Sequence, residues 1–190
     1  MVGGSAGGID ALLELLPALP ATLQAAVLVV LHLPRDRRSL LVEIFQPRCA
    51  LPLREAQDKD AITPGSVSFA PPDYHLLVDA GPQGPHVGLS VDPPLHFSRP
   101  SIDVLFESAA DHYGPRLVGI LLSGANEDGV HGLQAIQAAG VTSPGSILSN
   151  TMVFCIVGFR QTQRKRGGFL VFRRGCGFSL ICTVGEISSF

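Results

Sequence analysis

Within the first 140 residues of the chain, two stretches are apolar without interruption over the length of a single strand. They span residues 25–31 and 117–122. Continuous apolar runs of this length are typical of parallel strands that are covered on both faces. Three other segments repeat apolar residues at helical spacing, which predicts helices that face a core. Ser101 can cap the second of these helices. The apolar positions of the three helices are Ile9, Leu12, Leu13 and Leu16; Ile102, Leu105, Phe106 and Ala109; and Val130, Leu133, Ile136 and Ala139.

The middle of the chain has a different pattern. A short helix is predicted over 39–46. Between 51 and 98 prolines and glycines break the sequence into short apolar segments, which predicts small strands and a hairpin. Two of these, 75–79 and 86–91, flank a turn at 80–85 and predict a hairpin. The order strand, helix, strand, helix, irregular insert, helix, strand, helix predicts an α/β fold. We expect a doubly wound, mostly parallel sheet with helices on both faces and a small β-hairpin insert.

Composition narrows the class of protein. With 190 residues, 46% of them hydrophobic, the chain can bury the core of one domain. No apolar run reaches the roughly 18 residues of a membrane span, and no basic segment followed by an apolar stretch indicates a secretory signal. We therefore expect a soluble cytoplasmic protein with no membrane insertion. The formal net charge of −2 gives no overall footprint for nucleic acid or an anionic membrane.

Cysteines and histidines give no indication of a metal site. The four cysteines form no CxxC pair and have no histidine at metal-ligand spacing, which favours free thiols over zinc or disulfides. The six histidines are scattered, and no HExxH motif is present. We therefore expect no metal. The cysteines concerned are Cys49, Cys155, Cys176 and Cys182.

Charge changes abruptly near residue 140. Residues 1–140 carry 15 acidic and 8 basic side chains, whereas residues 141–190 carry one acid, Glu186, and six basic groups. The last fifty residues also hold three of the four cysteines and six of the ten phenylalanines. We divide the chain into a folded domain, 1–140, and an atypical basic tail, 141–190. The tail is either a surface for nucleic acid or lipid, or an out-of-frame or otherwise non-native segment that does not continue the fold.

The first eight residues place Ser5 in a Gly-x-Ser-x-Gly turn, directly before the helix that begins near Ile9. A hydroxyl in such a turn projects from the backbone, and the flanking glycines remove Cβ atoms that would block a substrate. The helix would also direct free N–H groups at an oxyanion beside Ser5. A plain glycine turn before a helix is the alternative interpretation. Only Met1 and Val2 precede the turn, whereas a central strand needs about five residues, so we expect a truncated first strand.

Two further side chains follow predicted strands and complement Ser5. His32 ends the first apolar run, and Asp128 lies in the loop after the second. Carboxyl ends of parallel strands meet at one edge of a sheet, where a histidine can take a serine proton and a carboxylate can orient the histidine. The order Ser, His, Asp differs from that of the α/β-hydrolases. Alternatively, Asp128 caps the helix that starts at Gly129, and His32 is a structural residue. We treat the remaining histidines as surface or packing residues: His75, His86, His96, His112 and His131.

Five segments of the chain, spread over roughly residues 2–140, resemble the catalytic domain of the chemotaxis protein-glutamate methylesterases. They are GGSAGG (3–8), VVLHLPRD (29–36), FAPPDYHLLV (69–78), RPSIDVLFES (99–108) and LLSGANEDGVHGL (121–133). The resemblance makes 1–140 a methylesterase-like catalytic domain, without the receiver domain whose phosphorylation controls many family members. It implies Ser5 as nucleophile, His32 as general base and acid, and Asp128 as orienting carboxylate.

The reaction implied by this resemblance is hydrolysis of γ-glutamyl methyl esters on the cytoplasmic helices of chemoreceptors, with release of methanol. Deamidation of receptor glutamines is a related activity, no cofactor is expected, and we expect a monomer. Backbone N–H groups at Ala6 and around Ala125 are the expected oxyanion donors, because both follow tight glycine-bearing turns at strand ends. Arg99 is either a contact for the acidic receptor surface or a solvated arginine.

Two other functional classes stay open. The chain is alternatively a catalytically inactive receptor-binding or scaffold protein. It is also compatible with a phosphate- or nucleotide-binding α/β module, since a glycine loop precedes a helix. Against the second class, Ser5 interrupts the G-x-G-x-x-G pattern and no G-K-[ST] follows.

Overall fold

The computed structural model describes residues 1–5, 7–122 and 127–140, together with strands at 152–155, 170–171 and 181–182. The chain divides into two compact units, residues 1–159 and 160–190. In the second unit, β9 (Leu170–Val171) pairs antiparallel with β10 (Ile181–Cys182). Across the described parts of the chain, no helix is both long and apolar enough to cross a membrane.

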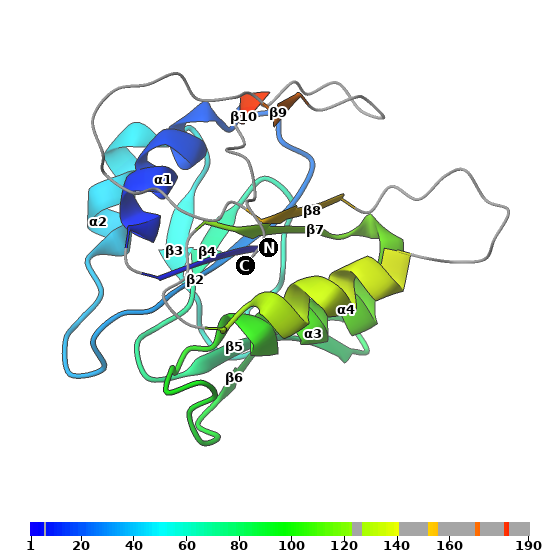
Figure 1. Ribbon diagram of the computed structural model, residues 1–190. Helices are drawn as coiled ribbons and strands as arrows, with labels where there is room; N and C mark the ends of the chain where they lie inside the picture. The colour runs from blue at the N-terminus through cyan, green and yellow to red at the C-terminus, as the bar shows by residue number, and fades with distance from the viewer. Residues whose placement is uncertain (6, 123–126, 141–151, 156–169, 172–180, 183–190) are drawn as a thin grey trace, which may run out of the picture. The chain divides into compact units, whose positions relative to one another are not determined.

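Six parallel strands form the sheet of the first unit, in the order β3-β4-β2-β1-β7-β8 (Figure 1). In that order they span Leu53–Glu55, Val67–Phe69, Val27–Leu31, Val2–Gly4, Val118–Leu121 and Met152–Cys155. From β1 the chain first adds β2, the edge strand β3 and then β4 between them on one side, and it crosses to the other side with β7 and β8. This reversal places a topological switch point at the carboxyl end of β1, where ligand crevices open in such sheets.

Helices cover both faces of the sheet (Figure 1). On one face lie α1 (Gly8–Leu15) and α2 (Leu41–Phe45), which 3₁₀ turns continue over Leu16–Ala18 and Gln46–Arg48. On the other lie α3 (Ile102–Tyr113), its 3₁₀ extension Gly114–Arg116, α4 (Val130–Gly140) and the hairpin of β5 (His75–Gly81) and β6 (Gly84–Ser90). The predicted doubly wound, mostly parallel fold with helices on both faces and a small hairpin insert is confirmed.

The continuous apolar run of β2 is explained by burial on both faces. Leu28 and Val30 pack into the core beneath α3, α4 and the hairpin. Val29 and Leu31 alternate with them and pack into the core beneath α1 and α2. Side chains alternate across a strand, so a strand covered on both faces needs apolar residues at every position.

The hairpin is tighter than its sequence indicated. Gly81 pairs with Gly84, so only Pro82 and Gln83 form the turn, and the strands extend into the predicted 80–85 loop. Gly84 adopts a φ of 106°, a conformation that glycine reaches without steric cost. The two glycines therefore close the hairpin where a longer loop was predicted.

Candidate active site

The three side chains that the sequence pattern paired follow three adjacent strands. Ser5 follows β1, His32 follows β2, and Asp128 lies between β7 and α4. The His32 N–H donates to the Gly4 carbonyl at 3.1 Å, and the Leu122 N–H donates to the Gly3 carbonyl at 2.8 Å. Backbone pairing thus continues on both sides of β1 up to the edge where the site lies.

His32 and Asp128 are joined by a hydrogen bond of 2.7 Å between Nε2 and Oδ2. The Asp128 side chain is fully buried and the His32 side chain is 14% exposed. An ionised carboxylate can only accept hydrogen bonds, so this contact assigns the proton to Nε2. In the neutral imidazole Nδ1 is then the unprotonated nitrogen, and it can accept a proton from a hydroxyl group.

From the described residues, the Asp128 carboxylate accepts four hydrogen bonds. Oδ1 accepts from the Ser101 hydroxyl at 2.7 Å and from the Asp103 N–H at 3.0 Å. Oδ2 accepts from His32 Nε2 and from the Ile102 N–H at 2.8 Å. Burial works to raise the pKa of Asp128, but the hydrogen bonds from His32 and its other partners outweigh it and hold that pKa below the usual value. The carboxylate is therefore held ionised in a fixed orientation.

Two aspartates cap each other's helices. The alternative that Asp128 caps the helix starting at Gly129 is wrong, because its oxygens accept N–H groups from the first turn of α3 instead. In return, Asp103 of α3 accepts the N–H groups of Gly129 at 2.9 Å and Gly132 at 2.7 Å through Oδ1. Ser101 is the N-cap residue of α3, but its hydroxyl makes no capping bond and donates to Asp128.

These supporting residues were not predicted to belong to the site. Ser101 and Asp103 lie at the start of α3, within the RPSID segment that carries the family resemblance, so the sequence did mark the region. Their partners lie at least 25 residues further along the chain. A pattern read within one helix cannot show that its cap comes from another helix.

Ser5 is half-buried at the start of the turn that leads into α1. Its carbonyl accepts the Gly8 N–H at 2.9 Å, and Gly7 adopts a left-handed φ of 86° as the N-cap residue of α1. Among the hydrogen bonds of the described residues, none joins Ser5 to His32. Ala6 and Ala125, the expected oxyanion donors, lie outside the described residues.

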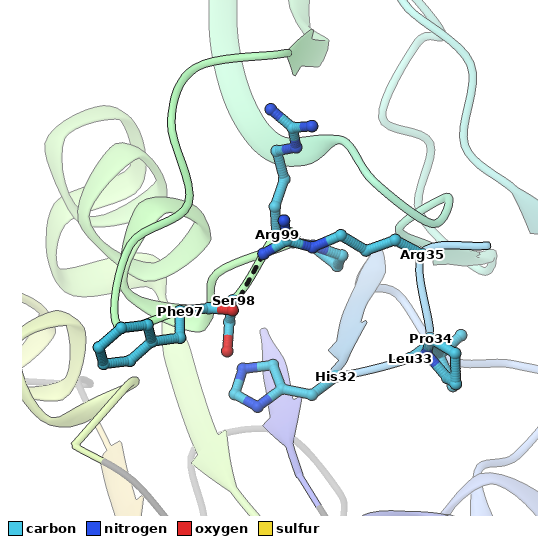
Figure 2. Close-up of a pocket in the computed structure, with 8 residues that line it drawn as sticks. His32, Leu33, Pro34, Arg35, Phe97, Ser98 and Arg99 are labelled. Carbon is cyan, nitrogen blue, oxygen red and sulfur yellow. Dashed lines mark hydrogen bonds between the residues drawn. The ribbon is translucent and has the colours of Figure 1, made fainter.

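A pocket of about 300 Å³ opens beside His32. Its walls are the segment that follows β2, from His32 to Arg35, and the segment before α3, from Phe97 to Pro100. Figure 2 shows the imidazole of His32 directed across the pocket toward Phe97 and Ser98, with Arg35 bonded to the Phe97 carbonyl at 3.0 Å. Phe97 is 98% exposed, so an aromatic side chain stands at the rim.

Arg99 is anchored inside the protein rather than solvated. Its Nε and Nη2 donate to Asp73 Oδ1 at 3.0 and 2.8 Å, and its Nη1 donates to the carbonyls of Val91 and Asp92. Arg35 Nε lies 3.7 Å from the same Asp73 oxygen. These bonds fix the wall of the pocket, and they leave Arg99 few donors for an external anion.

Three of the remaining histidines, which we expected only to pack or to face solvent, make polar contacts near the site. His75 is fully buried, and its Nδ1 accepts the Ser101 N–H at 3.1 Å while Nε2 donates to the Pro93 carbonyl at 3.2 Å. His75 therefore supports the residue that bonds Asp128. His96 and His131, far apart in the sequence, both approach Asp103.

Comparisons with known proteins identify the family. A family model described as CheB methylesterase matches residues 1–146. A protein of Leptospira interrogans named as a protein-glutamate methylesterase/protein-glutamine glutaminase is 39% identical over 140 residues, which is 74% of this chain and 71% of that protein. A protein-glutamate methylesterase/protein-glutamine glutaminase from Symbiobacterium thermophilum is 41% identical over 140 residues. The matched region is 74% of this chain and 38% of that protein.

A solved structure matches as well. The crystal structure of the Thermotoga maritima CheB methylesterase catalytic domain superposes with a TM-score of 0.72 at 25% identity, over 81% of this chain and 90% of that one. The family match covers Ser5, His32 and Asp128 together with the elements that carry them. The resemblance seen in the sequence is confirmed, and the chain belongs to the CheB methylesterase family.

Proposed function

We propose that this chain is a serine hydrolase that demethylates γ-glutamyl methyl esters on bacterial chemoreceptors. The observation that carries the proposal is the bond between His32 and the buried Asp128, formed at the switch point beside Ser5 in a member of this family. Deamidation of receptor glutamines would use the same site, as the paired name of the relatives suggests. The proposal places the protein in the cytoplasm, as a monomer, and requires no cofactor.

In the proposed mechanism Ser5 Oγ attacks the ester carbonyl while His32 Nδ1 takes its proton. The tetrahedral intermediate collapses, and His32 returns the proton to the departing methoxide, which leaves as methanol. A water molecule then attacks the acyl-enzyme with the same assistance from His32, and glutamate is released. Asp128 keeps the proton on Nε2 throughout and stabilises the imidazolium.

Oxyanion stabilisation is assigned to backbone N–H groups. Ala6 follows β1 at the start of the turn into α1, and Ala125 belongs to the segment between β7 and α4. Donors at these two positions would flank the carboxyl end of β1, where the ester carbonyl must lie for Ser5 to attack it. Fixed backbone donors of this kind supply a large part of the rate enhancement in acyl transfer.

The pocket gives the substrate a place to enter. It is open to solvent beside His32, and its rim carries the exposed aromatic ring of Phe97. Tyr74 and Val91 are further exposed apolar side chains, in the segments that hold Asp73 and the carbonyls bonded by Arg99. An amphipathic receptor helix offers apolar side chains to such a rim while its esterified glutamate enters the pocket.

Methanol release from methylated receptor tests this function. We expect release by the purified chain and a fall of about a thousandfold or more in Ser5→Ala, because the residual rate would come from binding and the oxyanion donors alone. Ser66→Ala, which removes a hydroxyl bonded to the Thr63 carbonyl before the amino end of β4, serves as the matched control and should retain the wild-type rate. Equal background rates for wild type and Ser5→Ala, with receptor binding retained, would instead indicate an inactive receptor-binding protein.

A further inference from the structure

Three side chains from separate parts of the chain converge at the first turn of α3. His96 comes from the segment before α3, Asp103 from its first turn, and His131 from the first turn of α4. Nε2 of His96 lies 3.5 Å from Asp103 Oδ2, and Nδ1 of His131 lies 3.8 Å from the same oxygen. All three potential ligand atoms lie within 4.8 Å of one another.

The Asp103 carboxylate is divided between two roles. Oδ1 is occupied by the N–H groups of Gly129 and Gly132, whereas Oδ2 has no hydrogen-bond partner among the described residues. The side chain is fully buried. A buried carboxylate oxygen without a hydrogen bond is costly, and in native proteins it commonly indicates an ion or water that completes the site. This oxygen faces the two imidazoles.

We propose that His96, Asp103 and His131 form a binding site for a divalent transition metal ion, with zinc as the best fit. Two imidazoles and a carboxylate are a common zinc ligand set that leaves a fourth position for water. Hard cations such as magnesium and calcium prefer oxygen ligands alone. The described residues hold no other group of three such side chains at ligand distance.

The distances fit a site that closes by movement of the imidazoles, whose ligand nitrogens lie within 4.8 Å of each other. Ligand atoms around a tetrahedral zinc ion lie about 3.3 Å apart, as follows from metal–ligand distances of about 2.0 Å. The two contacts to Asp103 Oδ2 exceed this by only a few tenths of an ångström. The His131 side chain is 62% exposed, so an ion can enter from solvent and the imidazole can rotate to bind it.

The proposed site adjoins the candidate active site and shares Asp103 with the contacts that support Asp128. The N–H of Asp103 donates to Asp128, and His96 directly precedes the Phe97–Pro100 wall of the pocket. A bound ion would link this wall to α3 and α4. We therefore expect metal to stabilise the fold and to hold the wall in place, whether or not the chain is an esterase.

Binding is tested by calorimetric titration of zinc sulfate into the full chain freed of any affinity tag, together with the shift of the thermal midpoint. We expect saturable binding with one ion and a higher midpoint. His131→Ala and His96→Gln should each weaken binding by roughly tenfold or more, and the double variant should abolish it. His112→Ala removes a histidine from the other end of α3 and should bind zinc as the wild type does.

Cobalt identifies the ligands. Tetrahedral cobalt absorbs visible light, and thiolate ligands add intense charge-transfer bands that a site of two imidazoles and one carboxylate lacks. We expect the visible absorption of tetrahedral cobalt without thiolate charge-transfer bands. This absorption should disappear in the double variant. The proposal is overturned if the wild type shows no saturable binding, if the double variant binds with unchanged affinity, or if the spectrum shows thiolate ligands. These readouts do not involve methanol release, so they are independent of the proposed esterase.

Discussion

At the scale of single residues, Asp128 combines a structural and a chemical role. Each of its oxygens accepts two hydrogen bonds, which is the full capacity of a carboxylate. Three of these bonds attach it to Ser101 and the first turn of α3, and the fourth orients His32. The Asp128 carboxylate therefore bonds both the His32 imidazole and the first turn of α3. The orientation of the imidazole depends on the position of that turn.

Asp128→Asn should separate these roles. The amide has one acceptor oxygen and one NH₂ group. The NH₂ group would face two of the donors that now bond the carboxylate, and it cannot accept hydrogen bonds from them. If the NH₂ group faces His32, the imidazole must carry its proton on Nδ1 and can no longer take one from Ser5. We expect methanol release to fall by about 10³- to 10⁴-fold while the protein stays folded. A rate within tenfold of wild type would contradict the assigned tautomer.

The same variant should also change how stability depends on pH. Folding lowers the pKa of Asp128. The ionised carboxylate therefore adds to the free energy of unfolding above the unfolded carboxyl pKa of about 3.9, and this stabilisation is lost as the pH falls through the lower pKa of the folded state. Near pH 7 we expect Asp128→Asn to be less stable by about 1–3 kcal/mol. Urea denaturation at pH 7 and near pH 3 should show this difference shrinking in acid, whereas a constant difference would contradict the argument.

Sequence patterns predicted which side chains form the candidate site, but they did not predict the contacts that support it. Ser5, His32 and Asp128 could be paired because each follows a recognisable strand or turn, and parallel strands end at a common edge. The pattern could not assign the nitrogen of His32 that meets Asp128, nor the exchange of caps between Asp128 and Asp103. Those contacts depend on how α3 and α4 pack, which no local periodicity specifies.

At the scale of elements, close packing of α3 against β1 sets the position of the site. An added Cβ at Gly3 would lie 2.3 Å from Ile102 Cγ2. Ile102 is fully buried and β-branched, so its side chain cannot rotate away. The Gly-x-Ser-x-Gly pattern suggested that this glycine gives a substrate access to Ser5. The structure adds a second requirement, because the glycine lets the helix that Asp128 caps approach the strand that Ser5 follows.

Gly3→Ala should therefore weaken both fold and site. We expect a loss of about 1–3 kcal/mol in the free energy of unfolding from overpacking, and a reduced rate of methanol release because α3 moves with Asp128. Ile102→Ala removes the atoms that the new methyl group meets. Urea denaturation of both single variants and the double variant should show that the two losses do not add. Full additivity would mean that Gly3 and Ile102 do not compete for the same space.

Long regular elements were predicted with their positions, whereas the small strands expected between 51 and 98 were predicted without positions. The strands near 25–31 and 117–122, the hairpin and all four helices of the first unit agree with their sequence patterns within a few residues. By contrast, β3 and β4 are three-residue strands inside a segment broken by proline. The strand β8 lies within 141–190, which we assigned to the tail although residues 152–157 are apolar without interruption. Such short strands are specified by their neighbours in the sheet more than by their own residues.

At the scale of the whole molecule, composition and three-dimensional contacts divide the chain differently. The charge balance changes near residue 140, and we drew the domain boundary there. The first compact unit extends to residue 159 and includes β8, which pairs parallel with β7 from Val118↔Met152 to Leu121↔Cys155. The change in charge composition reflects which side chains a segment carries, whereas the pairing of β8 with β7 shows which segment belongs to the sheet. Comparing chains that end at the two positions tests which boundary holds.

We expect a chain of residues 1–159 to unfold in one cooperative transition with the midpoint of the full chain, because the second unit is compact by itself. A chain of residues 1–140 should be less stable by roughly 2–4 kcal/mol, since it lacks the hydrogen bonds of a four-residue strand pair. Removing β8 exposes the outer edge of β7, whose carboxyl end leads to Asp128, so methanol release should fall with stability. Urea denaturation and methanol release of the two chains supply the measurement. Equal stability would place the boundary at residue 140 and leave β8 outside the functional domain.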